Sequence, residues 1–142
     1  MPVFECCRTA VVTASPEASV REVARLMSES NVGSVVIMTD DCCPIGIVTD
    51  RDLVTRVMAP DRNPKTTKIR EVMTTDLVVV EENTGLYEAL QCVRDKGIRR
   101  LPIVDGDGKL VGIITMDDII RLLGQELQCM GEVIREKASP AA

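Results

Sequence analysis

The sequence contains an internal repeat with an offset of 66 residues. The segment Gly46–Leu53, GIVTDRDL, aligns without a gap with Gly112–Ile119, GIITMDDI. Across the ranges 11–58 and 77–124 few residues are identical, but the hydrophobic pattern agrees almost throughout. A repeat of this length is one supersecondary unit that cannot bury its apolar face alone. We therefore expect two copies that pack against each other around a pseudo-twofold axis.

Each copy is predicted to contain a strand, a helix, two strands and a second helix. Apolar residues at 3.6-residue spacing indicate the helices, and short apolar runs between turn residues indicate the strands. The expected fold is therefore α+β, with two β-α-β-β-α repeats packed with pseudo-twofold symmetry, the first spanning residues 1–62 and the second residues 63–142. The predicted elements are 10–14, 19–30, 35–38, 45–48 and 50–58 in the first repeat, and 77–80, 85–96, 101–104, 110–114 and 116–123 in the second.

Local signals mark the first helix and the connection between the repeats. Ser19 followed by Glu22 has the pattern of a capping box, in which each side chain accepts a hydrogen bond from the backbone N–H of the other residue. Residues 59–68 hold two prolines among charged residues, which is typical of a solvated linker. Residues 69–73 are predicted to form a short helical turn at the entry to the second repeat.

An apolar stripe extends the last predicted helix beyond the second repeat. Leu127, Met130 and Ile134 continue its helical spacing, whereas residues 138–142 are expected to fray. Nothing else in the chain is expected to bury this stripe. It should therefore pack on the protein's own side or on a second subunit, and we favour a homodimer.

The composition argues against several classes of function. One Phe, one Tyr and no Trp leave no aromatic platform for stacking bases, and the net charge of −5 does not suit a phosphate-neutralising surface. The absence of histidine removes Ser-His, Cys-His and His-metal chemistry, so we expect no enzymatic activity and no catalytic residues. No apolar stretch approaches the roughly 20 residues of a membrane span. Nucleic acid and membrane are not expected as partners.

The six cysteines invite a metal or disulfide interpretation, but their spacing does not support one. None lies in a Cys-x-x-Cys arrangement, and two pairs are vicinal. No signal peptide is visible at the N-terminus. We expect reduced thiols in a cytoplasmic protein and no metal site, with a redox role for Cys42-Cys43, in a predicted turn, as a minor alternative.

The segment 105–109, DGDGK, superficially resembles the start of a calcium loop. Counting from Asp105, the twelfth position is Met116, where a calcium loop needs a bidentate Glu. The segment is therefore interpreted as the turn of a β-hairpin, built from residues that tolerate a positive φ.

A Thr-x-x-Asp motif follows the last predicted strand of each repeat, Thr49 with Asp52 in the first and Thr115 with Asp118 in the second. Helix capping explains this pattern, because Thr at the N-cap and an acid three residues later satisfy free backbone N–H groups. The same corner also suits a phosphorylated, polyhydroxylated ligand. The helix N-terminus and the hydroxyl attract phosphate, and the carboxylate accepts hydrogen bonds from sugar hydroxyls. Two such motifs at matching places make the second interpretation more specific.

The repeat ending in GIVTDRDL and GIITMDDI, together with GIRRLPIVD in the second copy, resembles a tandem pair of cystathionine-β-synthase (CBS) domains over about residues 8–123. The resemblance implies a compact pair whose clefts bind adenosine-containing ligands such as AMP, ADP or ATP, with NAD or S-adenosylmethionine also possible. It implies that Asp52 and Asp118 hold the ribose and that Thr49 and Thr115 lie near the phosphates. The segments 12–15 and 78–81, which include Thr13 and Val80, would lie near the base.

The two copies of the motif differ in charge. Arg99 and Arg100 precede the second strand of the second repeat, where the family often places phosphate-binding basic residues; the first repeat has Gly33-Ser34 there. Arg51 inside the first motif corresponds to Asp117 in the second. Arginine contacts to phosphate are among the stronger polar interactions, so we expect the Asp118 site to hold the more highly charged nucleotide. An ordinary role for the two arginines, at a helix end, remains the alternative.

Two functions remain open from the sequence. The first is a regulatory module that senses adenosine nucleotides and transmits the change to a separate effector protein. The second is a constitutive dimerisation or interaction scaffold whose clefts stay empty, since resemblance indicates fold better than ligand.

Overall fold

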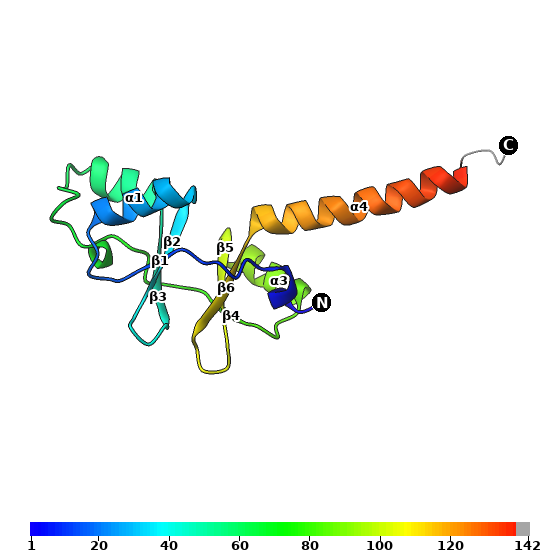
Figure 1. Ribbon diagram of the computed structural model, residues 1–142, viewed down its shortest axis with the longest axis horizontal. Coiled ribbons are helices and arrows are strands. Elements are labelled where there is room, and N and C mark those ends of the chain that lie inside the picture. The colour runs from blue at the N-terminus through cyan, green and yellow to red at the C-terminus, as the bar shows by residue number, and fades with distance from the viewer. Residues whose placement is uncertain (139–142) are drawn as a thin grey trace.

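Two three-stranded sheets, one from each repeat, stand side by side in the protein (Figure 1). The computed structural model describes residues 1–138, and Ser139–Ala142, which belong to the segment expected to fray, lie outside the described residues. The sheets have the orders β1-β2-β3 and β4-β5-β6. The strands are β1 Thr13–Ala14, β2 Ser34–Met38, β3 Pro44–Thr49, β4 Val80–Glu81, β5 Arg100–Val104 and β6 Leu110–Thr115. The helices are α1 Val20–Ser30, α2 Asp50–Leu53, α3 Leu86–Lys96 and α4 Met116–Ala138.

The two sheets have the same mixed topology and the same register. In each, the first strand runs parallel to the second, and the second pairs antiparallel with the third. Ala14 lies opposite Ile37 as Val80 lies opposite Ile103. The α+β fold of two matching repeats is therefore confirmed.

The predicted first strands and second helix are longer than the observed ones. Only residues 13–14 and 80–81 reach the ladder as edge strands, against predictions of 10–14 and 77–80. The helix predicted over 50–58 is α-helical to Leu53 and then widens to a π-helical turn, Val54–Met58. Thr55 Oγ1 donates to the Arg51 carbonyl at 3.0 Å, and a hydrogen bond of this kind often bends helices.

Short segments that precede each repeat are exchanged between the two sheets. The 3-10 turn Val3–Cys6 places Val3 in the core of the second repeat, and the 3-10 turn Ile69–Glu71 places Ile69 in the core of the first. In Figure 1 the blue N-terminal segment lies beside α3, at the second sheet. The sequence did not predict this exchange, although the turn at 69–73 is confirmed at Ile69–Glu71.

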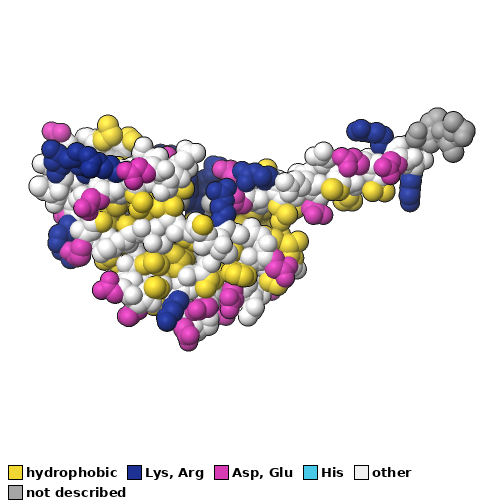
Figure 2. Space-filling view, viewed as in Figure 1, with side chains coloured by type: hydrophobic (Ala, Val, Ile, Leu, Met, Phe, Trp, Pro, Cys, Tyr) yellow, Lys and Arg dark blue, Asp and Glu magenta, His cyan; other side chains and the backbone are white. Residues whose placement is uncertain are grey.

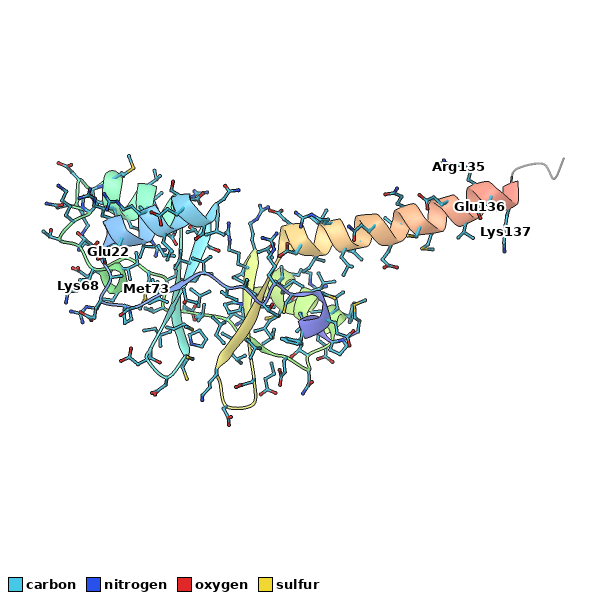
Figure 3. All side chains as sticks on the ribbon, viewed as in Figure 1. Glu22, Lys68, Met73, Arg135, Glu136 and Lys137 are labelled. Atoms are coloured by element: carbon cyan, nitrogen blue, oxygen red, sulfur yellow. The ribbon has the colours of Figure 1, made fainter. Side chains whose placement is uncertain are left out.

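Each exchanged segment crosses the last strand of the opposite repeat at a glycine. Arg8 bridges to Ile113 next to Gly112, and Thr74 bridges to Ile47 next to Gly46. A Cβ on Gly112 would lie 2.5 Å from Cys7 Sγ, and one on Gly46 would lie 2.5 Å from Met73 Sδ. Figure 3 labels Met73 beside the first sheet. The glycine of the repeated GI(V/I)T motif is thus required by close approach of a chain segment.

The sequence predicted that the connection 59–68 is a solvated linker, but part of it packs against the fold. Thr67 is buried, and its carbonyl accepts from the Val20 N–H at 2.9 Å. The Pro64 carbonyl accepts from the Arg21 N–H at 3.0 Å. The first N–H groups of α1 have no partner within the helix, and the connection supplies acceptors for them. At the same helix start, the Ser19–Glu22 capping box is confirmed.

The C-terminal helix α4 is continuous over 23 residues and projects from the two sheets (Figure 1). At 1.5 Å per residue it is about 35 Å long. Ile119, in its first turn, is buried in the second core, whereas Leu127 is 68% exposed and Ile134 66%. The expectation that the apolar stripe could pack on the protein's own side is therefore wrong, because α4 projects away from both sheets. No helix among residues 1–138 is long and apolar enough to cross a membrane.

Candidate functional site

Both Thr-x-x-Asp corners are capping boxes. The Thr49 N–H donates to Asp52 Oδ2 at 3.0 Å, and the Asp52 N–H donates to Thr49 Oγ1 at 3.1 Å. Thr115 and Asp118 repeat these two hydrogen bonds, each at 3.1 Å. The capping interpretation of the motif is confirmed in both repeats. It fixes the position of each carboxylate at the junction of strand and helix, so a site at this corner would be rigid.

A cavity of about 220 Å³ lies between the two repeats at the Thr115 corner. The first repeat contributes the segment before β1, the loop after α1 and two residues of β2. The second contributes the start of β5, the end of β6 and the start of α4, and the N-terminal segment contributes Arg8. The lining residues are Arg8, Ala10, Val11, Val12, Asn31, Val32, Gly33, Ser34, Val36, Arg100, Ile113, Thr115, Asp117 and Arg121. Most of the apolar lining residues come from the first repeat, whereas Arg100 and Arg121 come from the second.

Three guanidinium groups meet at this cavity, from Arg8, Arg100 and Arg121. Figure 2 shows Lys and Arg side chains gathered where the base of α4 meets the rest of the molecule. Asp117 lines the cavity beside them, and Arg8 and Arg121 also donate to the carboxylate of Asp118. The predicted basic residue Arg99 lies at an adjoining small cavity and is 3.8 Å from Asp117. The arrangement can bind a ligand that has both an apolar part and a negative charge.

The Asp118 carboxylate is almost completely buried and fully engaged. Its side chain is 7% exposed. Oδ1 accepts from Arg8 Nε at 3.0 Å, from Arg8 Nη2 at 2.7 Å and from Arg121 Nη1 at 3.4 Å, while Oδ2 accepts from the Thr115 amide and hydroxyl. Burial opposes ionisation of Asp118, but the Thr115 hydrogen bonds and the Arg8 guanidinium outweigh it and lower the pKa.

Arg8 stands between two cavities. One is the 220 Å³ cavity between the repeats; the other, of about 310 Å³, is lined by Glu5, Cys6, Arg8, Asp118, Arg121, Leu122 and Gln125. Both have Arg8 and Arg121 in their walls. The Arg8 backbone is fixed by two hydrogen bonds to Ile113, each 2.9 Å long, while 56% of its side chain is exposed. The side chain therefore has room to move about a fixed backbone.

The structure places the predicted site residues in different surroundings. Thr115, Asp117 and Arg100 line the cavity between the repeats, with Asp118 directly behind Arg8. The corresponding residues of the first repeat are not in that cavity. Asp52 Oδ1 lies 3.6 Å from Arg56 Nη2, and Arg51 is exposed.

The two residues expected near a base sit on edge strands. Thr13 pairs with Val36, which does line the cavity, and Val80 pairs with Ile103 in the opposite sheet. Thr13 itself is only a neighbour of the cavity wall, which is formed by Val11 and Val12 just before it. Their contact with a base stays a prediction.

Arg8 and Arg121 line the cavity but were not among the predicted site residues. The signal for Arg8 lies in the repeat itself, because the 66-residue offset extends to the N-terminus and aligns Val3 with Ile69 and Arg8 with Thr74. That extension would have marked the N-terminal segment as part of the fold. Arg121 has no comparable signal, since its spacing on α4 matches that of any exposed helical residue.

No group of three His, Cys, Asp or Glu side chains within residues 1–138 is arranged to hold a metal ion. All six cysteines are free thiols. Burial raises the pKa of both Cys6 and Cys7, which disfavours the reactive thiolate. Cys42 lies in the β2–β3 turn with φ of 64°, as the turn prediction implies.

Two β-α-β-β-α repeats with matching three-stranded sheets define this protein as a tandem pair of small α+β domains. The CBS domain model matches residues 3–59 and 69–125, so the chain belongs to the CBS domain family and contains two CBS domains in tandem. No catalytic domain is among these matches.

Among its relatives is an uncharacterized protein of Methanopyrus kandleri that is 46% identical over 84% of this chain. The match spans only 61% of the length of that relative. The CBS domain-containing protein YhcV of Bacillus subtilis is 40% identical over 82% of this chain and 81% of its own length. A CBS domain protein of Pyrobaculum aerophilum, solved in complex with AMP, matches this chain with a TM-score of 0.76 and 23% identity. The match covers 83% of this chain and 89% of that chain.

Proposed function

We propose that this protein is a regulatory module that binds an adenosine nucleotide at the Asp118 corner and has no catalytic activity of its own. The observation that carries the proposal is the cavity between the repeats, which three arginines and several valines line together with Thr115 of the capping box. Purine bases favour apolar walls, and arginines favour phosphates. A ligand with both parts suits a lining that contains both kinds of residue.

In this proposal the base lies against Val12 and Val36, and the phosphates face Arg100 and Arg121. The ribose hydroxyls donate to Asp118, which is the role that family resemblance assigns to it. A cavity of about 220 Å³ is smaller than typical ligand pockets of roughly 300–1,000 Å³. Withdrawal of Arg8 toward solvent would join it to the neighbouring 310 Å³ cavity and provide the missing volume.

AMP, ADP and ATP are the proposed ligands, with NAD and S-adenosylmethionine as possible alternatives. The AMP-bound relative supports an adenine nucleotide, since its fold is the same. A second, less basic site at Thr49, Arg51 and Asp52 is part of the proposal. Binding between the repeats would change how they meet, and a separate effector protein would read that change. The free thiols suit the proposed cytoplasmic location.

A thermal-shift screen with AMP, ADP, ATP, NAD and S-adenosylmethionine tests the proposal. A ligand that binds the native state must raise the melting temperature, because at one hundred times its Kd it adds about 2.7 kcal/mol to the free energy of unfolding. The follow-up is calorimetric titration of Asp118→Asn, which keeps a capping side chain but removes the charge. Asp107→Asn, in the exposed β5–β6 turn, is the matched control. Unchanged affinity in Asp118→Asn would remove the assigned ribose contact.

The second candidate function is a dimerisation scaffold with empty clefts. The exposed stripe of α4 favours it, because an uncovered apolar helix face of this length indicates an interaction surface. No stabilisation by any of the five ligands, together with a stable oligomer, would support the scaffold instead. A homodimer is compatible with both functions.

A further inference from the structure

The Asp118 carboxylate has no capacity left for a ribose while Arg8 holds it. Oδ2 is occupied by the amide and hydroxyl of Thr115, which are fixed by the capping box. Oδ1 receives both the Nε and the Nη2 of Arg8, at 3.0 and 2.7 Å, and a longer hydrogen bond of 3.4 Å from Arg121 Nη1. A carboxylate oxygen accepts about two hydrogen bonds, so a sugar hydroxyl can reach Oδ1 only if the Arg8 guanidinium leaves.

Arg8 can leave without unfolding its segment. Its N–H donates to the Ile113 carbonyl and its carbonyl accepts from the Ile113 N–H, so the backbone is held at the edge of β6. Val3, at the start of the same segment, is fully buried. Only the long side chain needs to rotate, and more than half of it already faces solvent. It also lines the wall of the 220 Å³ cavity, where the phosphates are proposed to lie.

We propose that Arg8 makes the Asp118 site selective for phosphorylated adenosine ligands over unphosphorylated ones. An adenosine ribose must break the Arg8–Asp118 ion pair and gives Arg8 nothing in return. A nucleotide breaks the same pair, but its phosphate then becomes the new partner of the released guanidinium. This inference rests on the proposed function, and it assigns to Arg8 a role that sequence analysis did not give it.

The test is calorimetric titration of AMP and adenosine into the full chain carrying Arg8→Ala. Adenosine affinity should rise about two- to fivefold, since an ion pair with an exposed partner opposes its binding by a modest amount. AMP affinity should fall about tenfold, because a charge-assisted contact to phosphate is lost. Arg62→Ala, which breaks the exposed Arg62–Glu71 ion pair away from the cavity, is the matched control and should change neither affinity.

The outcomes separate the two ideas. If wild-type protein binds neither AMP nor adenosine, the proposed function fails. If it binds AMP and loses affinity in Asp118→Asn, but Arg8→Ala leaves the ratio of AMP to adenosine affinity unchanged, only the role of Arg8 fails. An equal fall in both affinities would make Arg8 a simple part of the site and would also overturn the inference. Thermal unfolding of Arg8→Ala checks that the second repeat stays folded.

Discussion

The Asp118 carboxylate joins residues that are 110 positions apart in the chain. Its partners Arg8 and Thr115 come from the N-terminal segment and from the end of β6. Since they lower its pKa, the ionised form stabilises the folded state. The same carboxylate thus contributes both to folding and to the proposed ribose contact.

We expect this contribution to depend on pH. A lowered pKa in the folded state means that the stabilisation is present above the unfolded-state pKa of about 3.9 and is lost as the pH falls through the folded-state pKa. Urea unfolding of wild type and Asp118→Asn should differ most at neutral pH and down to about pH 5, and the difference should shrink below about pH 4. A difference that stays constant down to pH 3 would contradict the role of the charge.

The glycine of each GI(V/I)T motif permits a close crossing, and its replacement should be costly. In Gly46→Ala the new Cβ would meet Met73 Sδ and lie 3.1 Å from the Thr74 carbonyl oxygen. We expect a loss of about 1–3 kcal/mol in the free energy of unfolding, typical of overpacked sites. Gly106→Ala, where a Cβ would meet nothing within 4 Å, is the control and should change stability by less than about 0.5 kcal/mol. Equal effects in denaturant unfolding would exclude the steric explanation.

At the scale of elements, the parts of the fold that depend on local signals could be predicted. The α1 capping box at Ser19 and the β5–β6 turn at residues 105–109 follow from neighbouring residues, and the structure has both. The exchange of segments could not be predicted in this way, because Val3 and Ile69 are each buried in the core of the opposite repeat. Their burial depends on a surface that only the other repeat supplies.

The candidate site follows the same division. Thr115 and Asp118 could be found because the motif occurs twice, and Arg100 because its counterpart is uncharged Ser34. Arg8 could not be found from local sequence, since its partner lies 110 residues away. The α4 helix was predicted to continue, but its direction away from both sheets depends on how β6 ends, which no spacing pattern shows.

The exchange of segments predicts that a substitution in the N-terminal segment destabilises the second repeat. Val3→Ala should lower the free energy of unfolding by about 1–3 kcal/mol through a cavity in the second core. Hydrogen exchange should then increase more in β5 and β6 than in β2 and β3. Val79→Ala, at a position 38% exposed, is the control. A larger increase in β2 and β3 would mean that the N-terminal segment stabilises its own repeat instead.

At the scale of the whole molecule, α4 presents an uncovered apolar face. Leu127, Met130 and Ile134 are between 61% and 68% exposed, and Figure 2 shows hydrophobic side chains along one side of the projecting helix. Figure 3 places Arg135 and Lys137 at its far end, well beyond both sheets. A face of this kind fits the proposed homodimer.

If α4 carries the dimer contact, Leu127→Glu should convert the protein to a monomer. Leu127 is 68% exposed and is not part of the second core, so the fold should remain intact and the melting temperature should change only through dissociation. Sedimentation at several protein concentrations measures the change. Gln128→Glu introduces the same charge one residue away, off the apolar stripe, and should leave the dimer unaffected. A dimer that persists in Leu127→Glu would place the contact on another surface.

The exchanged segments also determine an order of events during synthesis. Arg8 is made early, yet its partners Ile113 and Asp118 are made more than a hundred residues later. The first sheet faces a shorter delay, because its closing segment at Ile69–Glu71 follows soon after its own strands. The segment around Val3 and Arg8 therefore stays unpaired until the second domain has been synthesised, and only then can it complete the second core.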